Sequence, residues 1–225
     1  MSDKILAATV MNEIEPRWTK QYVKIVQLIT AFPEVGHDFK GKKAPSKNSE
    51  EYFRRLAQKF ASGRKPTIPK PPATVPDEMV SIILNEYFDI DSEKLADIKH
   101  EHALSMGAEN IVGDLLERYI ASVLEPHGWI WCAGAVIKAV DFIKAPSKPA
   151  EKWQLLQVKN RSNSENSSSS AIRDGTDIEK WFRCFCYKPK TNWDNFPDTA
   201  LRKHLSEEEF KKFVIKYLKA QKSSV

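Results

Sequence analysis

The chain has 225 residues, of which 41% are hydrophobic and 29% are charged. This composition supports a packed core of ordinary size and excludes intrinsic disorder as the primary interpretation. The net charge at pH 7 is +5, which is compatible with a nucleic-acid partner but does not by itself indicate one. No apolar run approaches the ~20 residues of a membrane span, and the N-terminal residues lack the pattern of a signal peptide. We therefore expect a cytoplasmic protein without a membrane partner.

Basic residues are concentrated in one segment. Between residues 38 and 70 only three acids accompany Lys40, Lys42, Lys43, Lys47, Arg54, Arg55, Lys59, Arg64, Lys65 and Lys70. From residue 77 to residue 125 acidic residues predominate instead. One basic face on an acidic body steers a polyanion, which makes Lys42, Lys43, Arg54 and Arg55 candidate phosphate contacts. A solvated charged surface has the same pattern, so both interpretations stay open.

The three cysteines, Cys132, Cys184 and Cys186, give no even disulfide framework, and their spacing matches no zinc pattern. We expect Cys184 and Cys186 to be buried thiols. As a zinc pair they would need further ligands, and His204 is the only candidate nearby in the sequence.

The first quarter of the chain has helical periodicity. Apolar residues recur at a spacing of three to four on both sides of Pro16, which predicts helices over residues 5–14 and 18–29. A shorter helix is expected from Glu50 to Ala61, with Gly63 at its C-terminal cap.

Prolines separate this region from the rest. Residues 66–76 contain five prolines, which favour an extended, semi-rigid strap. A helix is predicted to begin near Asp77. We therefore expect residues 1–76 to form an N-terminal helical and basic arm with a proline-rich strap, and residues 77–225 to form the core.

The pattern after Gly107 mixes helix and strand signals. The expected elements, in chain order, are a helix over 109–124, strands over 129–143 and 153–158, a Ser/Asn-rich loop over 161–170, a helix over 176–186, and a helix that begins at Ser206 with a capping box to Glu209. Aromatic residues within the 176–186 helix recur at helical spacing, which is more typical of a core than of a base-stacking surface. This order predicts an α/β sandwich.

Three polar residues interrupt the apolar strands. Because strand side chains alternate between faces, Gln157 and Lys159 point to one face while Leu156 and Val158 point to the other. Asp141 lies in an apolar run at the end of the preceding strand. If the two strands pair, a carboxylate, an amide oxygen and an ammonium surround one point. A hard divalent cation prefers oxygen ligands, and a lysine beside it can orient water and stabilise charge, so the set suits phosphodiester hydrolysis.

Asp141 with Gln157-Val158-Lys159 resembles the PD-(D/E)xK nuclease motif, in the variant of Mrr-like enzymes where Gln replaces the second acid. The resemblance extends upstream to Gly113–Glu117 and to Gly128-Trp129 before the first strand. It implies a restriction-endonuclease-like α/β/α core with a mixed central sheet and Mg²⁺ as cofactor.

The same resemblance implies roles for individual residues. Asp141, Gln157, Lys159 and Glu117 would be catalytic, and Asp141, Glu117 and the carbonyl of Val158 would hold the metal. Two departures from the usual motif matter. Val140 replaces the motif's proline, and the neutral Gln157 makes the metal depend more on Asp141 and the carbonyl of Val158, with Glu117 restoring the missing charge.

A narrower resemblance covers residues 108–143, the Ser-rich loop, and the chain from Trp181 onward. These segments resemble the SinI group of type II restriction endonucleases. The resemblance implies a homodimer that cuts double-stranded DNA at a short, nearly palindromic site of the 5′-GGWCC-3′ kind, without a nucleotide cofactor.

Base readers are expected in the loop that follows the catalytic strand. Arg reads guanine best, Asn reads adenine, and an acid accepts from cytosine. The candidates are Asn160, Arg161, Asn163, Arg173 and Asp174. A plain solvent loop would have the same composition.

Two other functions fit the same residues. One is an Mrr-like or repair nuclease that recognises modified bases, ends or junctions, although the chain offers no separate winged-helix reader. The other is a DNA-binding protein on a catalytically inactive nuclease fold, which the retention of Asp141, Lys159 and Glu117 together disfavours.

Overall fold

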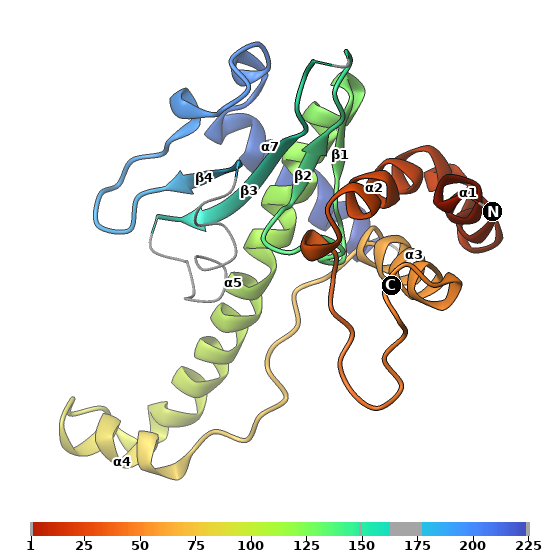
Figure 1. Cartoon of the computed structure of the whole chain (residues 1–225). Coiled ribbons are helices and arrows are strands. Elements are labelled where there is room, and N and C mark those ends of the chain that lie inside the picture. Colours follow the sequence, from red (N-terminus) through yellow and green to blue (C-terminus); the bar gives the residue numbers. More distant parts are fainter. Residues whose placement is uncertain (1, 149, 163–176, 224–225) are drawn as a thin grey trace.

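The computed structural model describes residues 2–148, 150–162 and 177–223. Its centre is a four-stranded mixed sheet with the strand order β1-β2-β3-β4 (Figure 1). Strands β1 and β2 and strands β2 and β3 are antiparallel, whereas β3 and β4 are parallel. The strand bounds are Trp129–Trp131, Phe142–Lys144, Gln154–Arg161 and Ile178–Cys184. The predicted α/β class is confirmed.

The N-terminal helices cover one face of this sheet. They are α1 (Asp3–Ile14), α2 (Thr19–Ala31) and α3 (Glu50–Gly63), so the three predicted N-terminal helices are confirmed. Their buried side chains share one hydrophobic core with Ile130 and Ile143 of the sheet. The N-terminal helices therefore pack as a layer on the sheet, and the proposed division at residue 76 stays a prediction.

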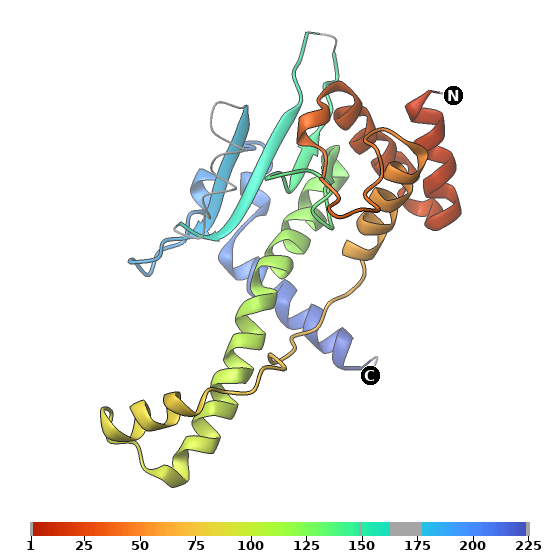
Figure 2. The same cartoon turned by 60° about the horizontal axis from the view of Figure 1, so that its bottom comes forward.

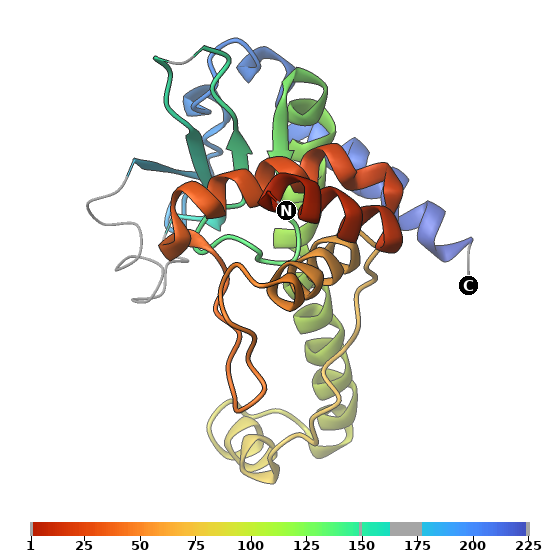
Figure 3. The same cartoon turned by 45° about the vertical axis from the view of Figure 1, so that its right-hand side comes forward.

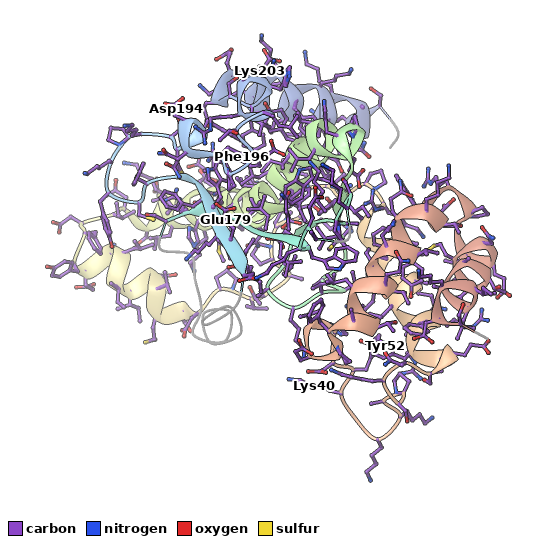
Figure 4. The ribbon with its side chains drawn as sticks, turned by 45° about the horizontal axis from the view of Figure 1, so that its top comes forward. Lys40, Tyr52, Glu179, Asp194, Phe196 and Lys203 are labelled. Carbon is purple, nitrogen blue, oxygen red and sulfur yellow. The ribbon has the colours of Figure 1, made fainter. Side chains whose placement is uncertain are left out.

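Two helices cover the opposite face. They are α5 (Leu95–Leu124) and α7 (Glu207–Lys222), and their apolar residues pack with Phe142 of β2 and Trp181 of β4. Figure 4 shows the two cores, with Phe196 on this side and Tyr52 among the N-terminal helices. The Ser206 hydroxyl accepts from the Glu209 N–H at 3.1 Å, which confirms Ser206 as the N-cap, but the Ser206 N–H donates to the Tyr119 hydroxyl at 3.2 Å, so only one half of the predicted capping box is present.

The helix predicted over residues 176–186 is wrong, because residues 178–184 of this range form strand β4, which pairs in parallel with β3. The sequence is rich in aromatic residues, which favour strands. Trp181 and Phe185 are four residues apart, a spacing that also places two side chains on one face of a helix, so the sequence pattern alone favoured a helix. Pairing with β3 satisfies the backbone along one edge and buries Trp181 between the sheet and α5.

The single strand predicted over residues 129–143 is also wrong. Strands β1 and β2 are separated by a loop in which Gly134, Ala135 and Ala139 have φ values of 80°, 52° and 55°. The loop is fixed to the segment before α3, because the His37 N–H donates to the Val136 carbonyl at 3.0 Å and the Lys138 N–H to the Val35 carbonyl at 2.8 Å. The N-terminal layer thus holds the loop that leads into Asp141.

Helix α5 begins at Leu95 rather than near Glu109, so half of it extends beyond the sheet. Helix α4 (Glu78–Glu86) precedes it, capped by the Asp77 carboxylate, which accepts from the Met79 N–H at 2.9 Å. The proline-rich segment runs beside α5 between α3 and α4 (Figures 1 and 2). A Cβ atom at Gly107 would lie 2.8 Å from the Lys70 carbonyl, which explains the glycine there.

In the part of the chain that the structure describes, no helix combines the length and the apolar character needed to cross a membrane.

One buried ion pair joins the N-terminal layer to the sheet. The Arg64 side chain, only 3% exposed, donates to Glu125 Oε1 at 2.5 Å and to the Trp131 carbonyl at 2.7 Å. Its guanidinium also lies over the rings of Trp18, Phe60 and Trp131 at 4.2, 4.6 and 5.3 Å. Such stacking is specific to a planar cation.

We expect Arg64→Ala to lower the free energy of unfolding by about 3–5 kcal/mol, because it leaves the Glu125 carboxylate without its buried partner. Urea denaturation measures the loss. Arg55→Ala is the control, since Arg55 forms an exposed ion pair with Glu51 at 2.7 Å. That variant should lose less than about 1 kcal/mol, and equal losses for the two variants would contradict the assignment.

Candidate active site

Asp141 is fixed against strand β3 by the main chain. Its N–H donates to the Leu156 carbonyl at 2.9 Å, and its carbonyl accepts from the Cys132 N–H at 2.8 Å. Its carboxylate atom Oδ2 accepts from the Val158 N–H at 2.7 Å. The side chain therefore completes the β2–β3 hydrogen-bonding pattern one residue before β2 begins.

Glu117 reaches the same place from helix α5. Its Oε2 atom accepts from Trp131 Nε1 at 2.8 Å. Burial, followed by the charge of Asp141, raises the pKa of Glu117 to about 8, while the charge of Lys159 acts in the opposite direction. Burial raises the pKa of Asp141 to about 6, against the lowering effects of the Val158 hydrogen bond and of Lys159. The two carboxylates and the ammonium are thus close enough to influence one another.

Gln157 lies opposite Asp141 in the β2–β3 register, one residue from the Phe142–Leu156 pair. Its side chain is 1% exposed, and its Oε1 atom has no hydrogen-bond partner among the described residues. A buried amide oxygen without a partner costs free energy unless a water molecule or an ion satisfies it. Strand alternation places Gln157 and the half-buried Lys159 on the same face of β3.

Trp131 was not singled out by the sequence. The alternation Trp129-Ile130-Trp131 held the signal, since both tryptophans must face one side of the sheet. That side is the one covered by α5. Trp131 therefore connects β1 to Glu117 and orients its carboxylate.

The expected base readers are only partly described. Asn160 Oδ1 accepts from Arg183 Nε at 2.9 Å, so this amide oxygen already has a partner within the chain. Arg161 lies exposed at the end of β3. Asn163, Arg173 and Asp174 lie outside the described residues.

The four expected phosphate contacts fall into two kinds. Lys42 and Lys43 are exposed in a turn of the loop before α3, in which Figure 4 labels Lys40. Arg54 instead pairs with Glu13 at 2.6 Å and with Glu50 at 3.1 Å. Arg55 is likewise paired with an acid of its own helix. The two lysines are therefore the stronger candidates.

The cysteine expectation needs a correction. Cys132 is buried, but Cys184 and Cys186 are only partly buried because they lie at the end of β4 and just beyond it. The Cys184 thiol donates to the Asn160 carbonyl at 3.1 Å. Within the described ranges, no three His, Cys, Asp or Glu side chains gather as a metal site.

Comparison with known proteins identifies the family. The sequence model of the SinI restriction endonuclease family matches residues 3–220. The chain belongs to the SinI restriction endonuclease family. It is 53% identical over 214 residues to the type II restriction enzyme Eco47I of Escherichia coli, and 50% identical over 215 residues to the type II restriction enzyme SinI of Salmonella infantis. Each match covers 95% of this chain and 93% of the relative. The resemblance to the SinI group is confirmed.

The SinI-family match begins at residue 3, so it includes α1–α3 as well as the sheet and α5. The N-terminal layer that supports the Asp141 loop is thus within the region that the family model matches.

We expect Glu117→Gln to stabilise the metal-free protein at alkaline pH. The folded-state pKa is about 8, against 4.5 for an ordinary glutamate. Between these two pH values the folded chain keeps a proton that the unfolded chain releases. The free energy of unfolding therefore falls as the pH rises from 4.5 to about 8. The amide still accepts from Trp131 and carries no charge. Near pH 8.5 in EDTA the Tm should rise by at least about 2 °C.

The gain should be largely lost near pH 4.5, where the folded carboxyl is protonated and that of the unfolded chain is half protonated. Glu109→Gln, at an exposed position of the same helix, is the control and should change the Tm little. If Glu117→Gln had a lower Tm than the wild type at pH 8.5, the ionised Glu117 carboxylate would not destabilise the folded protein, which would contradict the prediction.

Proposed function

We propose that this SinI-family chain is a type II restriction endonuclease that hydrolyses double-stranded DNA at a short, two-fold symmetric site with Mg²⁺. The observation that carries the proposal is the carboxylate of Asp141, bound at 2.7 Å to the Val158 N–H beside Lys159 and Glu117. This arrangement has the donor types of a PD-(D/E)xK centre, on a mixed sheet between helical layers.

The residues present fit a hard divalent cation. Asp141, Glu117 and the vacant Oε1 atom of Gln157 supply oxygen donors. The N–H and C=O of one strand residue point to the same edge, so the Val158 carbonyl faces the Asp141 side. Burial raises the pKa of both carboxylates, and for Glu117 the charge of Asp141 adds to this effect, so a bound cation would stabilise their charged forms.

Each residue has a distinct role in the proposed reaction. Asp141 and Glu117 would hold Mg²⁺, with the Val158 carbonyl and Gln157 completing the protein ligands. When bound, the ion lowers the pKa of a water molecule and offsets charge on the scissile phosphate. Lys159 orients the attacking water and stabilises the charge that develops on the phosphate oxygens. Trp131 keeps the Glu117 carboxylate turned toward this point.

We propose that the site is of the 5′-GGWCC-3′ kind and that the enzyme acts as a homodimer, because a two-fold site is matched most simply by a two-fold protein. Arg161 and Arg173 are the proposed guanine readers, with Asn160, Asn163 and Asp174 near them in the sequence. Arg binds the O6 and N7 atoms of guanine with two hydrogen bonds.

We expect Asp141→Ala and Lys159→Ala to abolish cleavage of unmethylated phage DNA with Mg²⁺, because each removes a group that acts on the reacting phosphate. The wild-type chain should give discrete bands. A smear would instead indicate a nuclease without a fixed site, and intact DNA a binding protein. Circular dichroism and the Tm check that the variants are folded.

Gln157→Glu should retain more activity than Gln157→Leu, since it keeps an oxygen donor at the buried position. Substantial cutting by Asp141→Ala or by Lys159→Ala at neutral pH would exclude this site as the catalytic centre.

Lys42→Gln with Lys43→Gln should weaken binding to specific and random duplexes alike, because phosphates carry no base identity. The slope of log affinity against log salt should flatten by about two units, one for each lost contact. Fluorescence anisotropy in Ca²⁺, which supports binding without cleavage, measures both duplexes. Arg54→Gln with Arg55→Gln is the comparison and should change the slope less, since acids of this chain already pair with both arginines. An unchanged slope for the lysine variant would place the loop away from DNA.

A further inference from the structure

Arg118 follows Glu117 in the sequence but lies on another side of helix α5. Successive residues of an α-helix are about 100° apart around its axis, so the two side chains leave the helix in different directions. The Arg118 side chain is only 9% exposed, and its Nε atom donates to Asp114 Oδ2 at 2.7 Å. Arginine is rarely buried to this extent unless it is paired, and the proposed reaction does not use this guanidinium.

The guanidinium binds the C-terminal end of helix α3. Its Nη2 atom donates to the Gly63 and Lys65 carbonyls at 3.1 and 2.6 Å, and its Nη1 atom donates to the Arg64 carbonyl at 3.2 Å. The last carbonyls of a helix have no partner within the helix, and a cation stabilises them. Figure 3 shows α3 (orange) in front of α5 (green), with the proline-rich segment leaving the end of α3. Arg118 therefore joins α5 to the point where the N-terminal layer ends.

The same cluster holds the start of the proline-rich segment. The Thr67 hydroxyl donates to Asp114, and the Thr67 N–H donates to the Tyr217 hydroxyl at 2.8 Å. That hydroxyl donates in turn to the Thr67 carbonyl at 3.1 Å. The Tyr217 ring of α7 lies 5.8 Å from the Arg118 guanidinium. The position of Arg118 is thus fixed by groups of α3, α5, α7 and the segment after α3.

The Arg118 guanidinium also lies over the ring of Trp131, 5.0 Å from its centre. A planar cation is attracted to the face of an indole ring and so restrains its orientation. The Nε1 atom of the same ring donates to Glu117 Oε2 at 2.8 Å. Because an indole is rigid, its face and its N–H move together. A displacement of the Arg118 guanidinium is therefore passed to the Glu117 carboxylate.

We propose that Arg118 is a positioning residue of the candidate metal centre, which acts on Glu117 through the Trp131 ring. The inference rests on the proposed function, because Glu117 is a proposed ligand of the cation. Groups behind metal ligands orient them, and their loss commonly weakens metal affinity about 10- to 100-fold. Arg64 also lies over the Trp131 ring, but it binds the Trp131 carbonyl and so holds the main chain.

A cap of α3 without influence on the metal centre is the alternative role of Arg118. The direction of the change in cation affinity separates the two roles. Loss of a positive charge by itself strengthens the binding of a cation nearby, whereas loss of the Trp131 orientation weakens it. Loss of a cap alone lowers the Tm and leaves the indole N–H where it is.

The first test is the indole N–H resonance of Trp131 in the metal-free, full-length chain. The chain has six tryptophans, and Trp131→Phe identifies the resonance in a two-dimensional ¹⁵N spectrum. Arg118→Met and Arg118→Lys should each shift it and make its proton exchange with water at least about 10-fold faster, because the hydrogen bond to Glu117 is weakened. Arg202→Met is the matched control. It removes the same charge and a hydrogen bond of 3.0 Å to the Phe196 carbonyl, and it should leave the Trp131 resonance unchanged.

The second test is the affinity of the chain for Mn²⁺ without DNA, measured from the electron paramagnetic resonance of the free ion. Mn²⁺ binds to the same oxygen donors as Mg²⁺. The Kd should rise about 10-fold in both Arg118 variants and stay constant in Arg202→Met. In the Trp131→Phe background, Arg118→Lys should change the Kd less than about 2-fold, because the ring that transmits the effect is absent.

Arg118→Lys keeps the inference testable if Arg118→Met does not fold, because lysine retains the charge but lacks the planar guanidinium. Circular dichroism checks the fold of each variant. An unshifted Trp131 resonance, an unchanged or lower Kd for Mn²⁺, or a full effect of Arg118→Lys in the Trp131→Phe background would each overturn the inference. A wild-type chain that binds no Mn²⁺ would also overturn it, even where that chain cuts DNA.

Digestion of unmethylated phage DNA separates this inference from the proposed function. If the Arg118 variants shift the Trp131 resonance and weaken Mn²⁺ binding, but the wild-type chain leaves the DNA intact, the proposed function is overturned and the role of Arg118 stands. If the wild-type chain gives discrete bands and the Arg118 variants bind Mn²⁺ as tightly as it does, the proposed function stands and the role of Arg118 is overturned.

Discussion

The buried guanidinium of Arg64 is the interaction on which the rest of the structure depends. It lies where α3, the turn Glu125–His127 and β1 meet, bound to Glu125 and stacked on Trp131. The same Trp131 ring donates its N–H to Glu117. Opposite this cluster, a Cβ atom at Gly63 would overlap the backbone of Gly134, so α3 approaches the β1–β2 loop as closely as two backbones allow. The N-terminal layer thereby fixes both the glutamate and the loop that ends at Asp141.

The candidate active site gathers charge that the fold alone does not favour. Two carboxylates with raised pKa values lie close to a half-buried lysine, and the residue opposite Asp141 in the strand register, Gln157, has a buried amide oxygen without a partner among the described residues. Groups perturbed in this way are common at functional sites, where the unfavourable energy is offset by packing elsewhere. Here the offset comes from the two hydrophobic cores on either side of the sheet and from the Arg64 cluster.

The features of the fold that depend on local periodicity could be predicted from the sequence. The N-terminal helices and the polar face of β3 follow from spacings of 3.6 and 2 residues, which the backbone imposes everywhere. Strand β4 could not be predicted in this way, because its aromatic spacing suits a helix and only pairing with β3 decides between the two. The early start of α5 was missed because its first turns bury nothing in their own chain. The contact of Gly63 with Gly134 joins distant segments and has no local signal.

Helix α5 is continuous over 30 residues, from Leu95 to Leu124, and its buried residues begin only at Gly107. Glu117 therefore lies on the packed half of a helix whose other half extends beyond the sheet (Figure 1). A continuous helix rises about 1.5 Å per residue and bends little. A force that displaces the extended half is therefore transmitted along the helix axis to Glu117, so the position of this carboxylate depends on contacts made far from it along the chain.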